Sequence, residues 1–354
     1  MANTPQKVNS VRIVGAGLIG TSIGLALCAR GVRIDMIDTN ASARNLAQDL
    51  VSGVEVQSPD LVIFALPSPA LSAVLNNEYH LNPKSRFIDI GSVKANPLRE
   101  VLKSDLPLER FLPTHPMAGR EVAGPQSARG DLFQSRSWIY CPAGVDGDVV
   151  EAALEVIGAL GSDPIEMSAS DHDRAVALVS HLPQAVASLL AKQLIGASDQ
   201  SLDLAGAGLR DSVRIAGSDP ALWSEIFSAN SENILPLLIN LQSDLHELID
   251  DLGKGQSARP WIEAGNKGKS LIPGKHGGKA RDYTQLPVVI EDKPGQLAAL
   301  LNECALAKVN VEDLSIEHSP GQFTGLITLS LSAPDAATLQ SHLIEQGWNV
   351  HSPR

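Results

Sequence analysis

The stretch Val11-Arg12-Ile13-Val14-Gly15-Ala16-Gly17-Leu18-Ile19-Gly20 carries the clearest structural signal in this chain. An apolar run that ends in glycine indicates a strand, and the residues from Leu18 to Arg30 indicate a helix. The G-x-G-x-x-G pattern between them permits a tight turn, a close approach of backbone to a pyrophosphate, and close packing of helix on strand. The sequence therefore predicts a dinucleotide site at this loop, formed by Gly15, Gly17, Leu18, Ile19 and Gly20.

Asp38 indicates which dinucleotide binds. It follows the second predicted strand, Val32 to Ile37, and stands 18 residues after Gly20. A carboxylate at this position accepts hydrogen bonds from ribose hydroxyls and repels a 2′-phosphate, so NAD is favoured over NADP. Arg44 lies nearby and can contact a phosphate, so NADP stays open. Leu66, at the end of the third predicted strand, is a further expected cofactor contact.

Further strands are predicted at residues 61–66, 86–90 and 110–113, and helical stretches separate them. Strands that alternate with helices indicate a parallel sheet whose connections cross over in the right-handed sense. We therefore expect an α/β fold in which the first domain, residues 1–166, is a Rossmann-like doubly wound parallel sheet that binds the dinucleotide.

The next part of the chain has long apolar-periodic stretches, from Asp173 to Leu194 and from Ala221 to Asp251. Apolar residues at three- and four-residue spacing indicate long helices with one apolar face. We expect residues 167–252 to form an all-helical domain for substrate binding and dimerisation, although a helical domain that packs only within the chain would show the same pattern.

Two segments follow the helices. Residues 253–281 hold seven glycines, seven lysines or arginines and one acidic residue. We expect the segment 253–284 to be a flexible linker, or a basic loop that closes over anionic groups of substrate or cofactor. Residues 285–354 show the order β-α-β-β-α-β, which is the ferredoxin-like pattern.

Composition narrows the class of protein. The chain has 354 residues, of which 44% are hydrophobic and 19% are charged, as is typical of a globular protein with a large core. Its net charge of −12 argues against binding to nucleic acid or to a membrane surface. No signal peptide is recognised after the short polar N-terminus, so a cytoplasmic protein is expected.

Two motifs are predicted at the carboxyl edge of the sheet, where such folds bind ligands. In Gly91-Ser92-Val93-Lys94, Ser92 can hydrogen-bond a histidine or the substrate, and Lys94 supplies a cation for a carboxylate. In the loop Thr114-His115-Pro116-Met117-Ala118-Gly119, His115 can exchange a proton near neutral pH. The alternatives are an ordinary helix N-cap for Ser92 and a structural or exposed histidine for His115.

A third motif, Ser180-His181-Leu182-Pro183-Gln184, lies inside the first long helical stretch. Proline removes a helix hydrogen bond, so Pro183 should kink the helix or mark its start. Such a kink aims His181 and Gln184 into a site.

A fourth motif contains Arg214 and continues through Asp219 and Pro220 to Trp223. Arginine forms bidentate pairs with carboxylates, so Arg214 is a candidate for binding a substrate carboxylate. A salt bridge from Arg214 to Asp211 or Glu225 remains an alternative.

Together with the glycine loop, these four motifs resemble those of the prephenate/arogenate dehydrogenases of tyrosine biosynthesis, in the same order, over residues 11 to about 250. The C-terminal segment, with Asp292-Lys293-Pro294-Gly295-Gln296-Leu297, resembles an ACT domain, a small module that often binds amino acids as regulators. The resemblance implies an NAD(P)-dependent enzyme that oxidises a cyclohexadienol at its ring carbinol with loss of the ring carboxylate. It implies no metal, a homodimer, and an amino-acid effector, tyrosine, near Pro294 and Gly295.

The same resemblance implies a role for each residue. His115 takes the proton of the substrate hydroxyl, and Ser92 orients His115 and contacts the nicotinamide region. Arg214 binds a substrate carboxylate with the help of Lys94. The residues that line or gate the pocket are His181, Asp211 and Trp223.

Gln184 departs from the family pattern, because many prephenate-using members have a second histidine there. That region senses the substrate side chain, which is a keto acid in prephenate and an amino acid in arogenate. A neutral amide accepts a hydrogen bond from an ammonium group, which a protonated histidine repels. The hypothesis is that Gln184 permits or favours arogenate.

Two other classes of protein remain possible from the sequence. One is a different oxidoreductase related to 6-phosphogluconate dehydrogenase, acting on an imine or a β-hydroxyacid, which would share the cofactor domain. The other is a non-catalytic sensor of amino acids in which the ACT module is the functional part.

Overall fold

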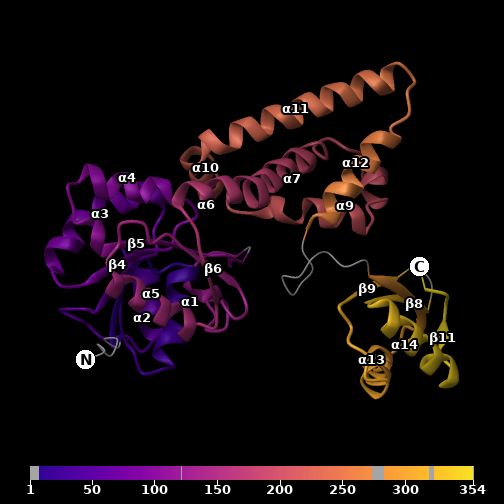
Figure 1. Cartoon of the computed structure of the whole chain (residues 1–354), viewed down its shortest axis with the longest axis horizontal. Coiled ribbons are helices and arrows are strands. Elements are labelled where there is room, and N and C mark those ends of the chain that lie inside the picture. The colour runs from indigo at the N-terminus through magenta and orange to yellow at the C-terminus, as the bar shows by residue number, and fades with distance from the viewer. Residues whose placement is uncertain (1–7, 121, 273–282, 319–322, 354) are drawn as a thin grey trace. The chain divides into compact units, whose positions relative to one another are not determined.

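The computed structural model describes residues 8–120, 122–272, 283–318 and 323–353 (Figure 1). The chain forms two compact units that divide after Leu245. The larger unit contains the glycine loop and the four motifs, and the smaller unit contains the C-terminal strands.

A seven-stranded sheet in the order β2-β1-β3-β4-β5-β6-β7 is the base of the larger unit. Its strands are β1 (Ser10–Val14), β2 (Arg33–Ile37), β3 (Leu61–Phe64), β4 (Arg86–Asp89), β5 (Phe111–Pro116), β6 (Ser137–Tyr140) and β7 (Asp163–Glu166). Since β1 pairs with β2 on one side and β3 on the other, the strand order reverses at β1. Open α/β sheets bind their ligands at the carboxyl ends of the strands beside such a reversal.

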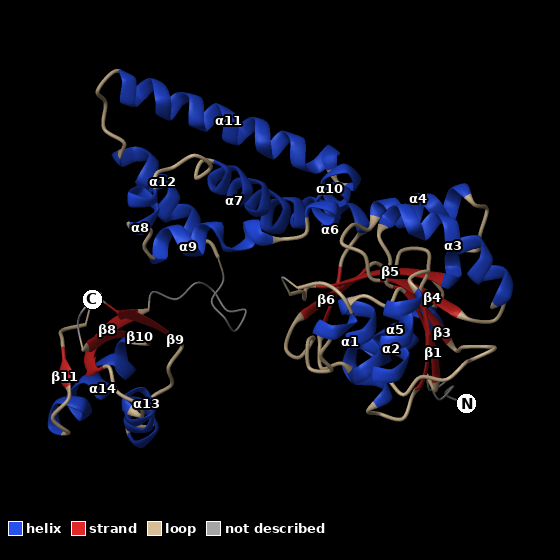
Figure 2. Cartoon of the chain, turned by 180° about the vertical axis from the view of Figure 1, so that it is seen from behind, coloured by secondary structure: helices blue, strands red, loops and turns tan. Residues whose placement is uncertain are grey.

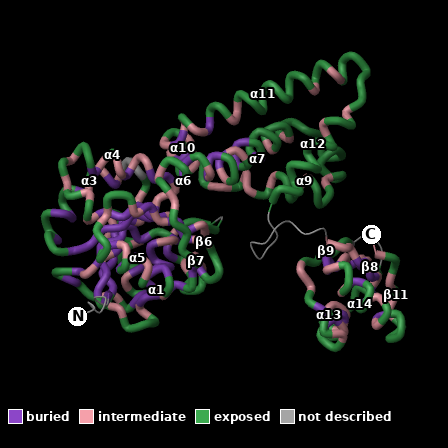
Figure 3. Tube along the Cα trace, in the orientation of Figure 1, coloured by how far each residue is buried: buried purple, intermediate pink, exposed green. Residues whose placement is uncertain are grey.

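Helices cover both faces of this sheet (Figure 2). The helices α1 (Leu18–Cys28), α2 (Ala41–Leu50) and α5 (Gly147–Ala159) pack on one face, and α3 (Ser68–Leu81) and α4 (Ala95–Lys103) pack on the other. Every residue of β3 and of β4 is buried, because both faces are covered (Figure 3). The predicted Rossmann-like doubly wound sheet is confirmed.

One strand pairing differs from the prediction of a parallel sheet. β5 and β6 pair antiparallel, with His115 opposite Ile139, whereas β6 and β7 pair parallel. The connection from β5 to β6 passes through a short 3₁₀ turn, η2 (Pro125–Ser127). An antiparallel pair needs no helical crossover, so the chain reverses direction here. The same pairing places His115 inside the end of β5, and not in a loop as the sequence suggests.

A helical domain follows the sheet, as predicted. Its helices are α6 (Ala169–Val176), α7 (Leu182–Lys192), α8 (Asp199–Asp203), α9 (Ala207–Val213), α10 (Pro220–Ala229) and α11 (Ser231–Gly253). A π-helical segment, η3 (Ala177–His181), joins α6 to α7, and Pro183 lies in the first turn of α7, where a proline is tolerated. Pro183 therefore lies where the π-helical segment changes to α7, within one continuous helical run, Ala169–Lys192. The single helix predicted from Ala221 to Asp251 is wrong, because Asn230 separates α10 from α11.

The continuous helical run Ala169–Lys192 is, in the part of the chain that the structure describes, the one helix long and apolar enough to cross a membrane. Length and composition alone are weak evidence. The run carries four buried polar side chains, namely His172, Asp173, His181 and Gln184. These side chains make hydrogen bonds inside the larger unit, which is the behaviour of a helix in a domain core.

The smaller unit begins in the last turns of α11 and continues into α12 (Arg259–Ser270). α12 lies inside the segment 253–284, so the prediction of a linker or loop is wrong for these residues. An i,i+4 ion pair of 2.7 Å between Arg259 and Glu263 stabilises this helix, and the indole of Trp261 donates to Asp251 at 3.0 Å. Residues 273–282 lie outside the described residues.

The rest of the smaller unit is a four-stranded antiparallel sheet in the order β11-β8-β10-β9. The elements are β8 (Thr284–Glu291), α13 (Gln296–Leu306), β9 (Asp313–His318), β10 (Thr324–Leu331), α14 (Ala333–Glu345) and β11 (Asn349–Val350). Apolar side chains from the two helices and from alternate positions of β8 and β10 form its core. The turn predicted at residues 319–321 lies outside the described residues.

Candidate active site

The glycine loop is held by contacts that exclude any side chain. Gly15 has φ +114°, and a Cβ there would lie 2.2 Å from the carbonyl oxygen of Ala65. A Cβ on Gly20 would lie 2.1 Å from the carbonyl oxygen of Gly15, so helix α1 packs directly on the turn. The backbone is thereby fixed before any ligand arrives.

Gly17 differs from the two other glycines because its surroundings are open. No atom lies within 4 Å of the position that its Cβ would take, and Gly17 is the N-cap of α1 without a side-chain cap. An uncapped helix N-terminus that faces open space is suited to bind a phosphate group. The residues of this loop therefore fit a dinucleotide.

Asp38 braces the same loop. Its Oδ2 accepts a hydrogen bond of 2.7 Å from the amide of Ala16, and its Oδ1 accepts one of 2.8 Å from the amide of Asn40. Each carboxylate oxygen has a second lone pair, so these contacts are compatible with the expected contact to ribose hydroxyls. Leu66 is half-buried beside Gly15, and Arg44 is exposed on α2.

His115 lies at the carboxyl end of β5 and contacts the first helix of the helical domain. Its Nδ1 is 2.8 Å from Nε2 of His172, and Nδ1 of His172 is 2.8 Å from Oδ1 of Asp173. His115 is half-buried, whereas His172 and Asp173 are almost completely buried. Among the described residues, Nε2 of His115 has no hydrogen-bond partner, so it is the nitrogen left for a substrate.

The pKa of His115 lies well below its ordinary value of 6.5. Burial is the main cause, since it disfavours the charged imidazolium, and the Coulomb interactions of that imidazolium with His172, Lys94 and His181 lower the pKa further. The imidazole is therefore neutral and ready to accept a proton at neutral pH.

Lys94 has a different role from the predicted one. Its side chain is fully buried, with Nζ 2.5 Å from Oδ2 of Asp89 and 2.5 Å from the carbonyl oxygen of Thr114. The ammonium group is thus paired with a carboxylate of the protein, and not left for a substrate carboxylate. Burial raises the pKa of Asp89, which Lys94 opposes. The pair fixes the backbone of β5 directly before His115.

Ser92 is half-buried in the loop after β4. No hydrogen bond joins it to His115 among the residues that the structure describes, although the sequence predicts that Ser92 orients this histidine. His172 is the residue that contacts Nδ1 of His115. The serine hydroxyl remains at the carboxyl edge of the sheet, where the cofactor is expected.

His181 and Trp223 meet on the helical side of the site. His181 is almost fully buried, with Nδ1 3.1 Å from Nδ2 of Asn230, and its ring lies edge-on to Trp223 at 6.0 Å between centroids. Burial lowers the pKa of His181 to about 4. Asn230 also donates to the carbonyl oxygen of Asp173 at 2.8 Å, so this cluster is connected to the His172–Asp173 pair.

Gln184 and the Arg214 segment lie side by side. Oε1 of Gln184 accepts a hydrogen bond of 3.4 Å from Ser218, and its Nε2 donates to Ser188 at 3.3 Å. The 3₁₀ turn η4 (Arg214–Gly217) packs against α7, and Arg214 at its start is exposed. Asp211 is exposed on α9.

Sequence reasoning did not single out His172, Asp173 or Asn230. The available signal was a run of four ionisable residues, 171–174, which includes His172 and Asp173 and directly precedes an apolar helical stretch. Burial of such groups requires hydrogen-bond partners, but the sequence does not show which partners are near.

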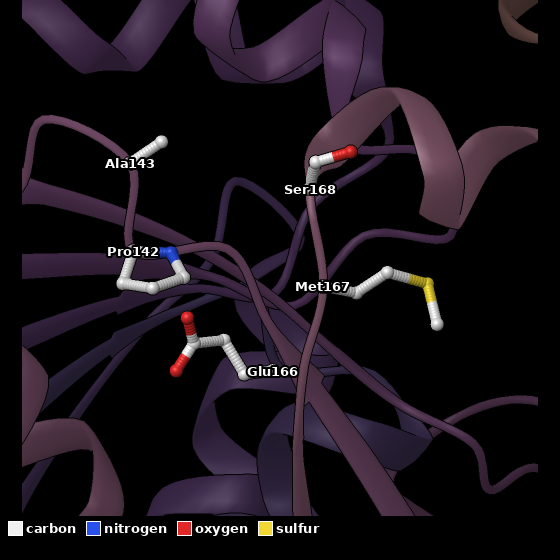
Figure 4. A pocket seen from close by; sticks show the side chains of 5 residues that line it. All are labelled: Pro142, Ala143, Glu166, Met167 and Ser168. Carbon is white, nitrogen blue, oxygen red and sulfur yellow. The ribbon is translucent and has the colours of Figure 1, made fainter.

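A hollow of about 570 Å³ lies elsewhere in the larger unit (Figure 4). Its lining residues are Pro142, Ala143, Glu166, Met167 and Ser168. None of them belongs to the glycine loop or contacts His115 through a hydrogen bond that the structure describes. The edge of the sheet at His115 is therefore kept as the candidate active site.

Replacing Lys94 by Met should strongly destabilise the protein. The change leaves Asp89 buried without its cation, which costs about 3–5 kcal/mol of unfolding free energy. The double variant Lys94→Met, Asp89→Asn should recover much of this loss, because no uncompensated charge remains. Urea unfolding of the three proteins measures the effect.

The matched control is Lys103→Met, since Lys103 is exposed and pairs with Glu100 on the surface of α4. That change should alter the unfolding free energy by less than about 1 kcal/mol. Unchanged stability in Lys94→Met would contradict the buried ion pair and return Lys94 to a role in binding substrate.

Comparisons with known proteins agree with this geometry. The model of the nucleotide-binding domain of prephenate dehydrogenase matches residues 16–165, and the model of the dimerization domain of prephenate dehydrogenase matches residues 168–259. The chain is 31% identical over 357 residues to the probable prephenate dehydrogenase NovF of Streptomyces niveus, which covers 96% of this chain and 99% of that protein. It is also 31% identical over 254 residues to the cyclohexadienyl dehydrogenase of Zymomonas mobilis, covering 67% of this chain and 86% of that protein.

Solved structures give the same result. The prephenate dehydrogenase of Aquifex aeolicus in complex with hydroxyphenyl propionate and NAD+ is 27% identical, with a TM-score of 0.66 over 75% of this chain and 98% of that chain. The arogenate dehydrogenase of Synechocystis is 25% identical, with a TM-score of 0.60 over 74% of this chain and 100% of that chain. Family models, sequence relatives and structural neighbours agree, and the chain belongs to the prephenate dehydrogenase family of NAD(P)-dependent dehydrogenases.

Proposed function

We propose that this chain catalyses the oxidative decarboxylation of prephenate or arogenate in tyrosine biosynthesis, giving 4-hydroxyphenylpyruvate or tyrosine. The observation that carries the proposal is the half-buried His115 at the carboxyl edge of the sheet, whose Nε2 is free to accept a proton. The relatives with this fold are prephenate, cyclohexadienyl and arogenate dehydrogenases.

The residues of the site divide the work of the reaction. The glycine loop would hold NAD, which would supply the acceptor for the hydride of the ring carbinol carbon. His115 removes the proton of the carbinol hydroxyl at Nε2, so the carbon becomes carbonyl-like as the hydride leaves. The ring carboxylate then departs as carbon dioxide, because the electron pair of its C–C bond completes the aromatic ring, and the resulting phenolate oxygen takes the proton back from Nε2 of His115.

The substrate is bound by residues around His115. Arg214 binds a substrate carboxylate, for which an exposed guanidinium on a rigid turn is suited. Ser92 contacts the nicotinamide region. His181, Asp211 and Trp223 line or gate the pocket.

The apolar surface of the helical domain supports a homodimer. Exposed side chains on η3, α7 and α11 include Leu178, Val179, Leu189, Leu235, Ile239 and Leu245. Their exposure leaves an extended apolar surface of the kind that obligate dimers bury. A cytoplasmic location is consistent with soluble biosynthetic relatives.

Replacing His115 by Asn should lower kcat by roughly 10²–10⁴-fold, because the general base is lost. The affinity for NAD should stay the same, since the glycine loop is untouched. In the wild type, kcat should fall with decreasing pH only well below pH 6.5, because the base must be unprotonated and its pKa is lowered. Steady-state kinetics from pH 5 to pH 9, with NAD binding measured by calorimetry, test both statements.

A kcat of His115→Asn within about tenfold of wild type would remove His115 from the role of base. A loss of acid-side activity already above pH 6.5 would contradict the lowered pKa. His80→Gln is the matched control, since His80 is exposed on α3 and bonds only its own helix among the described residues.

Substrate choice is assigned to Gln184. At an assay pH low enough to protonate the introduced histidine, replacing Gln184 by His should lower the ratio of kcat/KM for arogenate to that for prephenate by about 10- to 100-fold, since like charges about 4 Å apart repel by roughly 1–4 kcal/mol. Gln193→His, on the exposed end of the same helical region, is the control. The assay uses both substrates with NAD and NADP. Equal or better turnover of prephenate by the wild type would overturn the preference for arogenate.

Residues 285–354, the C-terminal part of the smaller unit, are proposed to form a ferredoxin-like ACT domain that binds tyrosine near Pro294 and Gly295. Gly295 has φ +91° and begins α13, so the turn after β8 is tight and the helix N-terminus lies open. Tyrosine should bind the full-length protein and inhibit it, as calorimetry and kinetics with added tyrosine would measure. If neither tyrosine nor phenylalanine binds, the unit has no role in sensing them.

A further inference from the structure

A chain of three ionisable side chains runs from the proposed base into the helical domain. His115 contacts His172 at 2.8 Å, and His172 contacts Asp173 at 2.8 Å. The side chains of His172 and Asp173 are only 1% and 2% exposed, so each proton in the chain has a defined partner. The mechanism above uses only the first of these residues.

The carboxylate of Asp173 is held by two backbone amides in addition to His172. Its Oδ1 accepts a hydrogen bond of 2.8 Å from the amide of Lys94, and its Oδ2 accepts one of 2.9 Å from the amide of Ala95. Burial alone would raise its pKa, but the hydrogen bonds from His172 and these two amides hold the pKa below the usual range. The carboxylate is therefore charged at neutral pH and acts as an acceptor only.

The polarity of the chain follows from this acceptor. Nδ1 of His172 faces a carboxylate, so it carries a hydrogen. A neutral imidazole has a single N–H, which leaves Nε2 of His172 as an acceptor. Nδ1 of His115 must then be the donor of the next hydrogen bond, and Nε2 of His115 keeps its lone pair.

The opposite direction, in which Nε2 of His172 donates its hydrogen to Nδ1 of His115, is ruled out for both protonation states of His172. If Nε2 of a neutral His172 donated to His115, Nδ1 of His172 would be bare, and two acceptors would lie 2.8 Å apart at Asp173. If His172 carried both hydrogens, it would be a cation and His115 would hold its own hydrogen on Nε2. In that state His115 could not take a proton from a substrate hydroxyl.

We propose that His172 and Asp173 are positioning residues that hold His115 in the Nδ1–H tautomer and so present Nε2 as the base. This inference rests on the proposed function, in which His115 removes the proton of the carbinol hydroxyl. The pair fixes both the ring orientation and the tautomer, because the hydrogen bond at one ring nitrogen determines where the proton lies.

The same pair stabilises the product of proton transfer. When Nε2 accepts the hydroxyl proton, His115 becomes an imidazolium whose Nδ1–H still donates to His172. The positive charge then lies one imidazole away from the carboxylate of Asp173, in a buried setting where such an attraction is strong. The hydrogen bonds from His115 to His172 and from His172 to Asp173 both remain in place, so the only proton that moves is the one taken from the substrate hydroxyl.

The tautomer can be tested in the resting full-length protein. Imidazole nitrogen resonances of ¹⁵N-histidine-labelled wild type distinguish a protonated Nδ1 from a protonated Nε2, and His115→Asn identifies the resonances of His115 by their loss. The expected result is a protonated Nδ1 and a bare Nε2 on His115. A protonated Nε2 on His115 overturns the proposal, whatever the activity of the enzyme.

Kinetics provide the second test. His172→Leu removes the acceptor and should lower kcat and kcat/KM together by about 10²-fold, while KM changes little, because the interaction matters in the transition state. His172→Gln retains an amide oxygen that can accept from Nδ1 of His115, so it should recover at least about tenfold of this loss. The control is His80→Gln, which should behave as wild type.

Two results separate failure of this inference from failure of the proposed function. If wild type oxidises neither prephenate nor arogenate, the function fails, and the tautomer measurement still decides the positioning role. If wild type is active but folded His172→Leu and His172→Gln both remain within about twofold of its kcat, the positioning role is overturned and the function stands. Unchanged NAD affinity in the variants confirms that they are folded.

Discussion

The carboxylate of Asp173 is the contact on which the geometry of the site depends. It accepts the amides of Lys94 and Ala95 at the start of α4, and thereby attaches the first helix of the helical domain to the edge of the sheet. The adjacent His172 is brought onto His115 by the same attachment. A site built from a strand end and a neighbouring helix can be rigid only if such a contact fixes the two together.

The buried ion pair of Lys94 and Asp89 acts on the other side of His115. The ammonium group of Lys94 donates a hydrogen bond to the carbonyl oxygen of Thr114. Its positive charge lowers the pKa of His115 in addition to the larger effect of burial. A base with a lowered pKa is weaker, but it is unprotonated over the whole neutral range. Asp173 offsets the weakness, because its charge favours the imidazolium once the proton has been transferred.

The sequence predicts backbone features well where steric rules act locally. The glycine loop, the doubly wound sheet and the start of α7 at Pro183 follow from residues that allow few conformations. The sequence predicts side-chain partners poorly, because partners come from distant segments. Lys94 has the charge expected of a carboxylate ligand, yet its carboxylate is Asp89, and His172 lies 57 residues from the base that it contacts. The sequence predicts a linker or loop where α12 lies, because the segment is rich in glycine. The ion pair between Arg259 and Glu263 that stabilises this helix is not evident from the composition.

Chemistry and substrate choice occupy different elements of the larger unit. His115 is on β5, whereas Gln184 is on α7, held by Ser188 and Ser218. Buried hydrogen bonds join His181, which ends the π-helical segment before α7, to Asn230, and Asn230 to the backbone carbonyl oxygen of Asp173. A change at position 184 alters the charge that meets the substrate side chain, without touching the hydrogen bonds that set the tautomer of His115. In the proposed function, the same proton transfer serves a keto acid or an amino acid, and Gln184, which lies outside the chain of His115, His172 and Asp173, is the residue proposed to select between them.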